Sequence, residues 1–116
     1  MYIFINLQYG DTLHDQNNLE QKHNIKITTL TEIDLMNDFE KLSALLCSLD
    51  LFVTVSNSTA HLAGALNVPT ILIKPKSFAI FHYWNQPNSI TPWYSSIELI
   101  DQGDNKEKFL EKLKIK

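Results

Sequence analysis

The segment that most constrains the fold of this chain is Leu51–Pro69, which reads LFVTVSNSTAHLAGALNVP. It begins with the apolar run Leu51–Val55, a pattern typical of a central parallel strand that helices cover on both faces. The small polar residues Ser56–Thr59 follow, and then comes a helix of small apolar residues that contains one histidine. We expect Asn67 to take a left-handed conformation after this helix, and Pro69 prevents the helix from continuing. A strand that leads directly into a helix is typical of an α/β protein.

Strand-like and helix-like segments alternate along the rest of the chain. Such alternation indicates right-handed crossovers and a parallel sheet. We therefore predict a three-layer Rossmann-like parallel sheet of about five strands, with helices on both faces, as a single domain over residues 1–116. The other expected strands are Tyr2–Leu7, Ile25–Leu30, Thr70–Ile73 and a segment within Ser95–Ile100, and the other expected helices are Thr12–His23 and those that begin near Asn37 and Asp104.

The helix that begins near Asn37 has the clearest periodicity. Asn37 is the expected N-cap, and Glu40 follows it at the spacing of a capping box. We expect Cys47 to be a small, half-buried structural residue beside the apolar stripe, because no base lies near it in sequence. The stripe recurs with the helical period of 3.6 residues and comprises Phe39, Leu42, Leu45, Leu46 and Leu49.

Composition and charge exclude several classes of function. The formal net charge of −3 argues against non-specific binding of nucleic acid, which needs a basic surface. The apolar runs are far too short to span a membrane, and no signal peptide is recognisable, so we expect a cytoplasmic protein. The histidines have no metal-ligand spacing with one another or with Cys47, and we expect no metal.

The polar turn Ser56–Thr59 is the best candidate for a binding site. The carboxyl ends of parallel strands share one edge of a sheet, so this turn, Gln8 and Lys74–Ser77 should lie along the same rim. Free N–H groups and the dipole of the helix that follows favour an anion there, and His61 could donate a hydrogen bond to it. The simpler interpretation is an N-cap followed by a core histidine.

Other residues near this rim have two interpretations each. Lys74 and Lys76 could neutralise a bound anion, although lysines beside a proline more often belong to a solvated loop. Trp84, Trp93 and Tyr94 could stack on a base or a sugar, but packing at the edge of the core explains them equally well. The turn lacks the glycine pattern of a P-loop, and Ser58 is not in a G-x-S-x-G elbow.

Four segments of the chain together resemble a known family. In their order and spacing, over about residues 3–100, they resemble the C-terminal, nucleotide-sugar-binding domain of bacterial GT-B glycosyltransferases. The relevant members are the heptosyltransferases and the related sugar transferases that follow tetratricopeptide repeats. The segments are Leu7–Asp11 (LQYGD), Asp34–Asp38 (DLMND), Asp50–Leu66 (DLFVTVSNSTAHLAGAL) and Thr91–Ser95 (TPWYS).

This resemblance implies a role for each part of the rim. The donor diphosphate would face Asn57, Ser58, Thr59 and His61, with charge support from Lys74 and Lys76. The nucleotide-sugar is then a substrate, and neither a cofactor nor a bound metal is expected, because GT-B enzymes stabilise the leaving diphosphate with positive charge and helix N-termini. The base and ribose would lie near Gln8, Met36, Asn37 and Asp38.

The resemblance also implies what this sequence lacks. The N-terminal domain of a GT-B enzyme, which brings the acceptor and the general base, has no counterpart, so the catalytic residues are unknown. The first strand of the donor domain is also missing, and closure of the sheet over that gap predicts the strand order 2-1-3-4-5. We expect the partner to be a missing N-terminal domain or a second copy of the chain. The alternative function is a non-catalytic nucleotide-binding or assembly module derived from this family.

Overall fold

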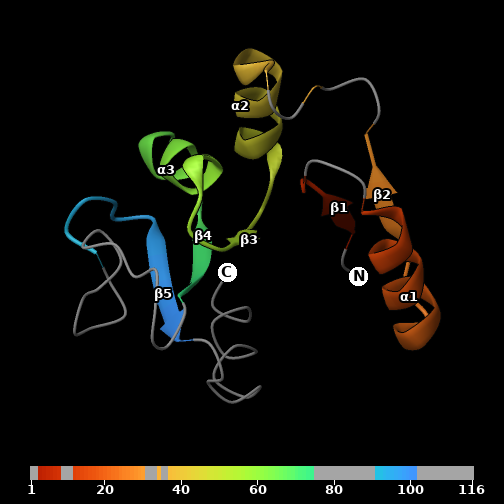
Figure 1. The fold of residues 1–116 in the computed structure, drawn as a ribbon. Helices are drawn as coiled ribbons and strands as arrows, with labels where there is room; N and C mark the ends of the chain where they lie inside the picture. The colour runs from red at the N-terminus through yellow and green to blue at the C-terminus, as the bar shows by residue number, and fades with distance from the viewer. Residues whose placement is uncertain (1–2, 9–11, 31–33, 35–36, 75–90, 102–116) are drawn as a thin grey trace. The chain divides into compact units, whose positions relative to one another are not determined.

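The computed structural model describes residues 3–8, 12–30, 34, 37–74 and 91–101 (Figure 1). The chain divides into two compact units, Met1–Leu42 and Ser43–Lys116, and each is described by itself. Parallel strands alternate with helices along the chain, so the predicted α/β class is confirmed. The predicted helix near Asp104 lies outside the described residues.

The first unit is built around a β–α–β crossover. Strand β1 (Phe4–Asn6) leads through helix α1 (Leu13–His23) to strand β2 (Ile27–Thr29), and the two strands pair in parallel. Helix α1 confirms the helix predicted at Thr12–His23, and it has no buried residue. It ends at Asn24, which adopts the left-handed conformation with φ of 51° and donates its N–H to the carbonyl of Glu20.

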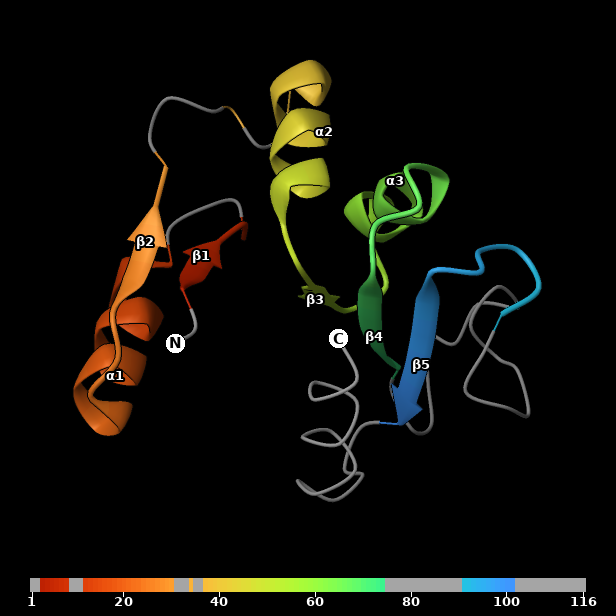
Figure 2. The same ribbon diagram turned by 180° about the vertical axis from the view of Figure 1, so that it is seen from behind.

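The second unit contains a three-stranded parallel sheet. Strand β3 (Phe52–Thr54) is followed by helix α3 (Ser58–Ala65), strand β4 (Thr70–Lys74) and strand β5 (Ile97–Asp101). Strand β4 lies between the other two (Figure 2). The left-handed turn predicted after α3 is present at Asn67, with φ of 58°. The core of this unit comprises Ala60, Leu72, Ile97 and Leu99, all buried.

Burial on both faces occurs in β4 and does not occur in β3. In β4, the successive residues Ile71 and Leu72 are both fully buried. In the segment predicted as the central strand, Phe52 is buried but Val53 and Val55 are 42% and 56% exposed. Among the described residues β3 lies at one end of the three-stranded sheet, so the central-strand prediction is not met in that sheet, because an apolar strand sequence does not by itself decide between end and centre.

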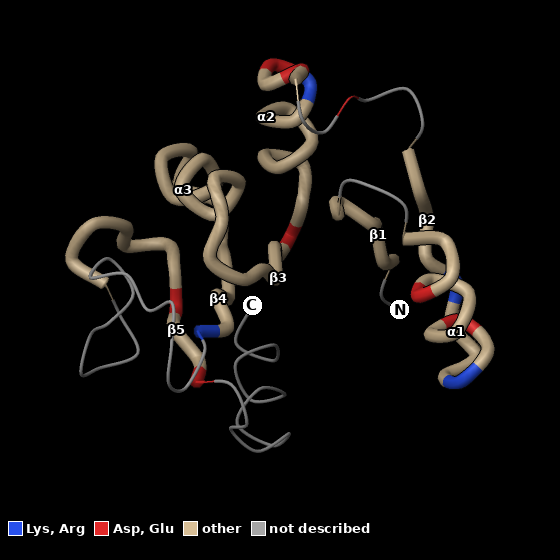
Figure 3. The backbone as a smooth tube through the Cα atoms, viewed as in Figure 1, with Lys and Arg blue, Asp and Glu red and all other residues tan. Residues whose placement is uncertain are grey.

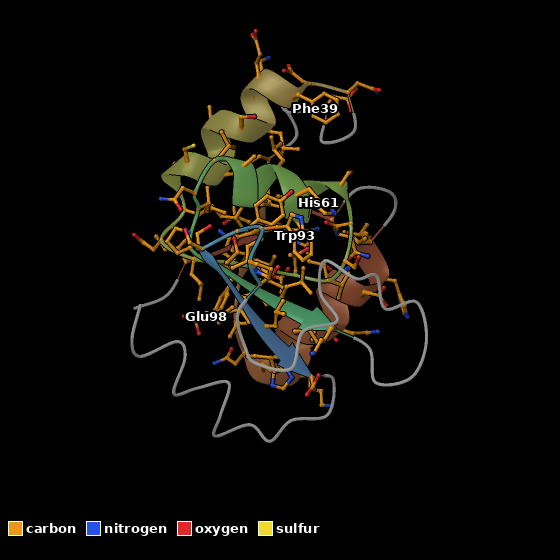
Figure 4. The ribbon with its side chains drawn as sticks, turned by 90° about the vertical axis from the view of Figure 1, so that its left-hand side faces the viewer. Phe39, His61, Trp93 and Glu98 are labelled. Carbon is orange, nitrogen blue, oxygen red and sulfur yellow. The ribbon has the colours of Figure 1, made fainter. Side chains whose placement is uncertain are left out.

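Helix α2 (Phe39–Ser48) begins later than predicted. The side chain that caps it is Asp38, whose Oδ1 accepts the N–H of Lys41 at 3.1 Å, so the N-cap prediction at Asn37 was wrong. Leu42 and Leu46 are buried as predicted, but Phe39 is 59% exposed at the first residue of the helix (Figure 4). Cys47 is exposed and not half-buried.

The sheets contain part of the predicted strand order. Among the described residues, the pairs β1–β2, β3–β4 and β4–β5 are present, all of them parallel. They form one two-stranded and one three-stranded sheet in place of the predicted sheet of five strands. Within the described ranges, no helix is long and apolar enough to cross a membrane.

Candidate functional site

Asn57 fixes the turn between β3 and α3. Its backbone is extended, and its side-chain Oδ1 accepts a hydrogen bond from the N–H of Ala60 at 2.8 Å, so the N-cap expected in this turn is present and is Asn57. Its Nδ2 donates to Oγ1 of Thr54 at 3.2 Å. This second bond ties the cap to the last residue of β3, so the helix begins directly at the carboxyl end of the sheet.

The first turn of α3 can present backbone donors at this end of the sheet. The side chain of Asn57 accepts a hydrogen bond from the N–H of Ala60. The first turn can then direct the N–H groups of Ser58 and Thr59 at an anion. The side chain of Ser58 is exposed and that of Thr59 is half-buried. A ligand can therefore reach this turn from solvent.

The site contains no formal charge of its own. No Asp, Glu, Lys or Arg occurs from Leu51 to Ile73, and the tube through β3 and α3 is uniformly uncharged (Figure 3). Attraction for an anion at this turn must therefore come from the helix dipole and from hydrogen bonds. The dipole supplies about 0.3–1 kcal/mol per charge at an exposed helix end.

His61 lies on α3 (Figure 4) and forms a side-chain pair with Tyr94. Nδ1 of His61 is 2.9 Å from the hydroxyl of Tyr94, and the two rings meet edge to face with their centroids 5.6 Å apart. Tyr94 also packs against the core cluster of the second unit. The packing interpretation of Tyr94 is thus confirmed. His61 contacts Tyr94, and Tyr94 is in turn fixed by its packing against the core.

Gly64 provides the space for the ring of Tyr94. A Cβ at this position would lie only 2.5 Å from Cγ and Cδ1 of that ring. Glycine inside a helix costs about 1 kcal/mol relative to alanine, so its presence needs a local reason. The close approach of Tyr94 is that reason.

Lys74 is part of β4 and forms an ion pair. Its Nζ lies 3.4 Å from Oδ1 of Asp101, and the two residues face each other in the register of β4 and β5. The side chain of Lys74 is only 14% exposed, which contradicts the solvated-loop interpretation. The carboxylate of Asp101 offsets the positive charge that Lys74 could offer to an anion. Lys76 lies outside the described residues.

The residues predicted to contact the nucleoside belong to the first unit. The N–H of Gln8 donates to Oδ1 of Asn6 at 3.0 Å, and Asn37 bonds through its N–H and its Nδ2 to the carboxylate of Asp34. Asp38 caps α2 and lies 3.8 Å from Nζ of Lys41. The structure therefore gives Asn37 and Asp38 local roles at the start of α2. Met36 lies outside the described residues.

Sequence reasoning missed a polar network around Gln16 in the first unit. Its Nε2 donates to the carbonyl of Ile27 at 2.9 Å, and its Oε1 accepts from Thr29 at 2.9 Å and from Asn6 at 3.3 Å. One side chain thus links α1 to both strands. Nothing in the polar sequence of α1 distinguishes Gln16 from its neighbours, so only the fold identifies it.

The pairing of His61 with Tyr94 was also missed. The two residues are 33 positions apart, and no local pattern connects them. The one signal available was a glycine inside the helix one turn after His61.

Trp93 is half-exposed and Trp84 lies outside the described residues, so stacking of either on a base stays a prediction. Among the described residues, no cluster of three or more His, Cys, Asp or Glu side chains could hold a metal ion.

Comparison with known proteins gives one relative. The chain is 31% identical over 96 residues, 82% of its length, to Protein FlbA of Caulobacter vibrioides, and the match covers 15% of that protein. The chain therefore spans a small part of the relative that it matches. No family model and no solved structure matches the chain.

Proposed function

We propose that this chain is a glycosyltransferase-family domain that binds the nucleotide-diphosphate part of a sugar donor in the cytoplasm, for transfer to an acceptor hydroxyl. The observation that carries the proposal is the start of α3. An asparagine cap places the N-terminus of this helix at the carboxyl end of a parallel sheet, and His61 follows within the first turns. Ligands of open α/β sheets bind at this end of the strands.

The chemistry of the proposed site follows from its donors. The N–H groups of Ser58 and Thr59 and the imidazole of His61 donate to oxygens of the diphosphate. Hydrogen bonds to a charged group contribute roughly 1.5–3 kcal/mol each. Donors fixed before the reaction stabilise negative charge as it develops on the leaving diphosphate, and this requires no metal.

The proposal includes a finer architecture. We propose that the two units form one domain over residues 1–116, with a single sheet in the order 2-1-3-4-5. The observed pairs β1–β2, β3–β4 and β4–β5 are neighbours in that order. Gln8, Met36, Asn37 and Asp38 then belong to the nucleoside end of the site, and a GT-B N-terminal domain or a second copy of the chain is the partner.

Calorimetric titration with UDP, ADP and GDP tests the proposal. At least one of them should bind, and His61→Ala should weaken its binding about 10-fold or more, the value of one hydrogen bond to a charged group. His14→Ala is the matched control, because His14 is an exposed histidine on α1. Failure of all three nucleotides to bind at millimolar concentration would contradict donor binding by this chain.

A non-catalytic nucleotide-binding or assembly module is the second candidate. The observation in its favour is that the carboxylates of Asp38 and Asp101 both have structural partners, since Asp38 caps α2 and Asp101 pairs with Lys74. Neither is placed as a general base for an acceptor hydroxyl. Nucleotide binding without hydrolysis or transfer of the sugar, in the presence of candidate acceptors, would favour this module over the enzyme.

A further inference from the structure

The contact between His61 and Tyr94 joins two groups that can each donate or accept a hydrogen bond. Nδ1 of His61 lies 2.9 Å from the Tyr94 hydroxyl, a distance at which one of them must carry the shared hydrogen. A neutral imidazole has one N–H and one acceptor nitrogen, so the partner of Nδ1 decides what Nε2 can do.

The chemistry of the two groups favours one direction for this bond. A phenol is a stronger acid than a neutral imidazole N–H, and an imidazole nitrogen is a much stronger base than a phenol oxygen. The favoured arrangement therefore has the hydroxyl of Tyr94 as the donor and Nδ1 of His61 as the acceptor. In the neutral ring, the hydrogen must then lie on Nε2.

We infer that Tyr94 is a positioning residue, which holds His61 in the Nε2–H tautomer so that the neutral ring donates a hydrogen bond to the diphosphate. This inference rests on the proposed function for the identity of the acceptor. The tautomer itself rests only on the contact between the two side chains.

The surroundings of Tyr94 make it a fixed support. Its ring lies against Gly64, where no side chain can intervene, and packs on the buried cluster that includes Ala60 and Leu72. The edge-to-face contact also restrains the plane of the imidazole, with the rings at 68° to each other. A donor whose orientation is fixed before the ligand arrives loses less conformational entropy on binding.

The consequence is a site that does not depend on a charged histidine. The segment Leu51–Ile73 contains no charged residue, and a neutral donor at His61 lets it bind an anion without uptake of a proton. The binding affinity should therefore persist at a pH at which the imidazole is neutral. It should fall when the tautomer is no longer fixed.

Long-range ¹H–¹⁵N NMR spectra of the imidazole side chains test the tautomer directly. In the full chain at a pH at which the spectrum shows a neutral ring, we expect Nδ1 of His61 to be unprotonated and Nε2 to be protonated. Tyr94→Phe keeps the ring against Gly64 but removes the hydroxyl, and it should produce a mixture of tautomers. His14 and His23, both exposed on α1, are internal controls that should not change. An Nδ1–H tautomer in the wild type, or unchanged His61 signals in Tyr94→Phe, would overturn the inference.

A binding cycle tests the consequence for the ligand. Tyr94→Phe should weaken binding of the preferred nucleotide among UDP, ADP and GDP about 3- to 10-fold, the value of one neutral hydrogen bond. His61→Gln places an amide donor near the position of Nε2 and has no Nδ1, so Tyr94→Phe should have little further effect in that background. An equal loss in both backgrounds would show a merely structural role and overturn the inference.

The two hypotheses fail in different ways. If no nucleotide binds the wild-type chain, the proposed function is wrong, while the spectra still decide the tautomer. If a nucleotide binds and the tautomer is unaffected by Tyr94→Phe, the site stands and the role of Tyr94 is wrong.

Discussion

Different kinds of interaction stabilise the interior of each of the two units of this chain. In the first unit, α1 buries no residue, and hydrogen bonds through the side chain of Gln16 connect it to β1 and β2. In the second unit, α3 and its strands enclose an apolar cluster that includes Ala60, Leu72 and Ile97, all fully buried. The candidate site lies on the second unit.

This difference has consequences for stability and for binding. Side-chain hydrogen bonds that are partly exposed compete with water, and each contributes only about 0.5–1.5 kcal/mol net. Apolar burial contributes more per side chain, roughly 1.5–3 kcal/mol. The start of α3 therefore rests on the more strongly stabilised support, as a preorganised binding site requires.

The largest effect is expected for the core of the second unit. Leu72→Ala removes a fully buried side chain from β4 and should lower the free energy of unfolding by about 2–5 kcal/mol. Leu19→Ala on α1 is the matched control, because Leu19 is an exposed leucine, and it should cost less than about 1 kcal/mol. Urea denaturation measures both. Equal losses would remove the contrast between the two units.

A second prediction concerns the contact between Gly64 and Tyr94. Gly64→Ala should lower the free energy of unfolding by about 1–3 kcal/mol, because the new methyl group displaces the ring of Tyr94. In a Tyr94→Ala background the same substitution should be neutral or stabilise the chain by up to about 1 kcal/mol, since only helix propensity is left. Thermal denaturation of the wild type and the three variants measures this cycle. The same sign in both backgrounds would contradict the contact.

A smaller effect is expected for the polar network of the first unit. Gln16→Ala leaves the side chain of Thr29 and the carbonyl of Ile27 without this partner, and the cost should be about 1–2 kcal/mol. Hydrogen exchange should show faster exchange in β1 and β2 and little change in β4 and β5. Gln21→Ala, at an exposed position of the same helix, is the control and should change neither. Faster exchange throughout both units would show that they unfold together.

The smallest effect is expected for the ion pair of Lys74 and Asp101. Asp101→Asn should lower the free energy of unfolding by no more than about 1 kcal/mol, because the carboxylate is largely exposed. The loss should shrink at high salt, since salt screens exposed charges. Asp50→Asn removes an exposed carboxylate beside β3 and serves as the control in urea denaturation at two salt concentrations. A loss that is independent of salt would show that the pair acts through packing.

Local patterns in the sequence predicted much of the fold. The strand–turn–helix at Leu51–Pro69, an N-cap within the turn Ser56–Thr59 and the left-handed turn at Asn67 depend on neighbouring residues, and all three are confirmed. The buried positions Leu42 and Leu46 followed from helical periodicity. Such features are determined within a few residues, so a single sequence contains enough information to predict them.

Features that depend on distant residues could not be predicted in this way. The sequence of β3 does not reveal that it lies at one end of the described three-stranded sheet, because the identity of its neighbours is a property of the sheet. The contact of His61 with Tyr94 and the pairing of Lys74 with Asp101 join residues that are far apart in the sequence of the second unit. The site residues were predicted from a local pattern, but the residues that contact them, Tyr94 and Asp101, lie far from them in the sequence.

The most direct test of the central claim is an NMR titration of the full chain with UDP, ADP and GDP that follows the backbone amides and the imidazole side chains. If the start of α3 holds the diphosphate, the largest saturable shifts should occur at the N–H groups of Ser58 and Thr59 and at the imidazole of His61. The exposed histidines of α1 should stay unchanged. Saturable binding that shifts other parts of the chain and leaves these three groups unaffected would contradict the claim.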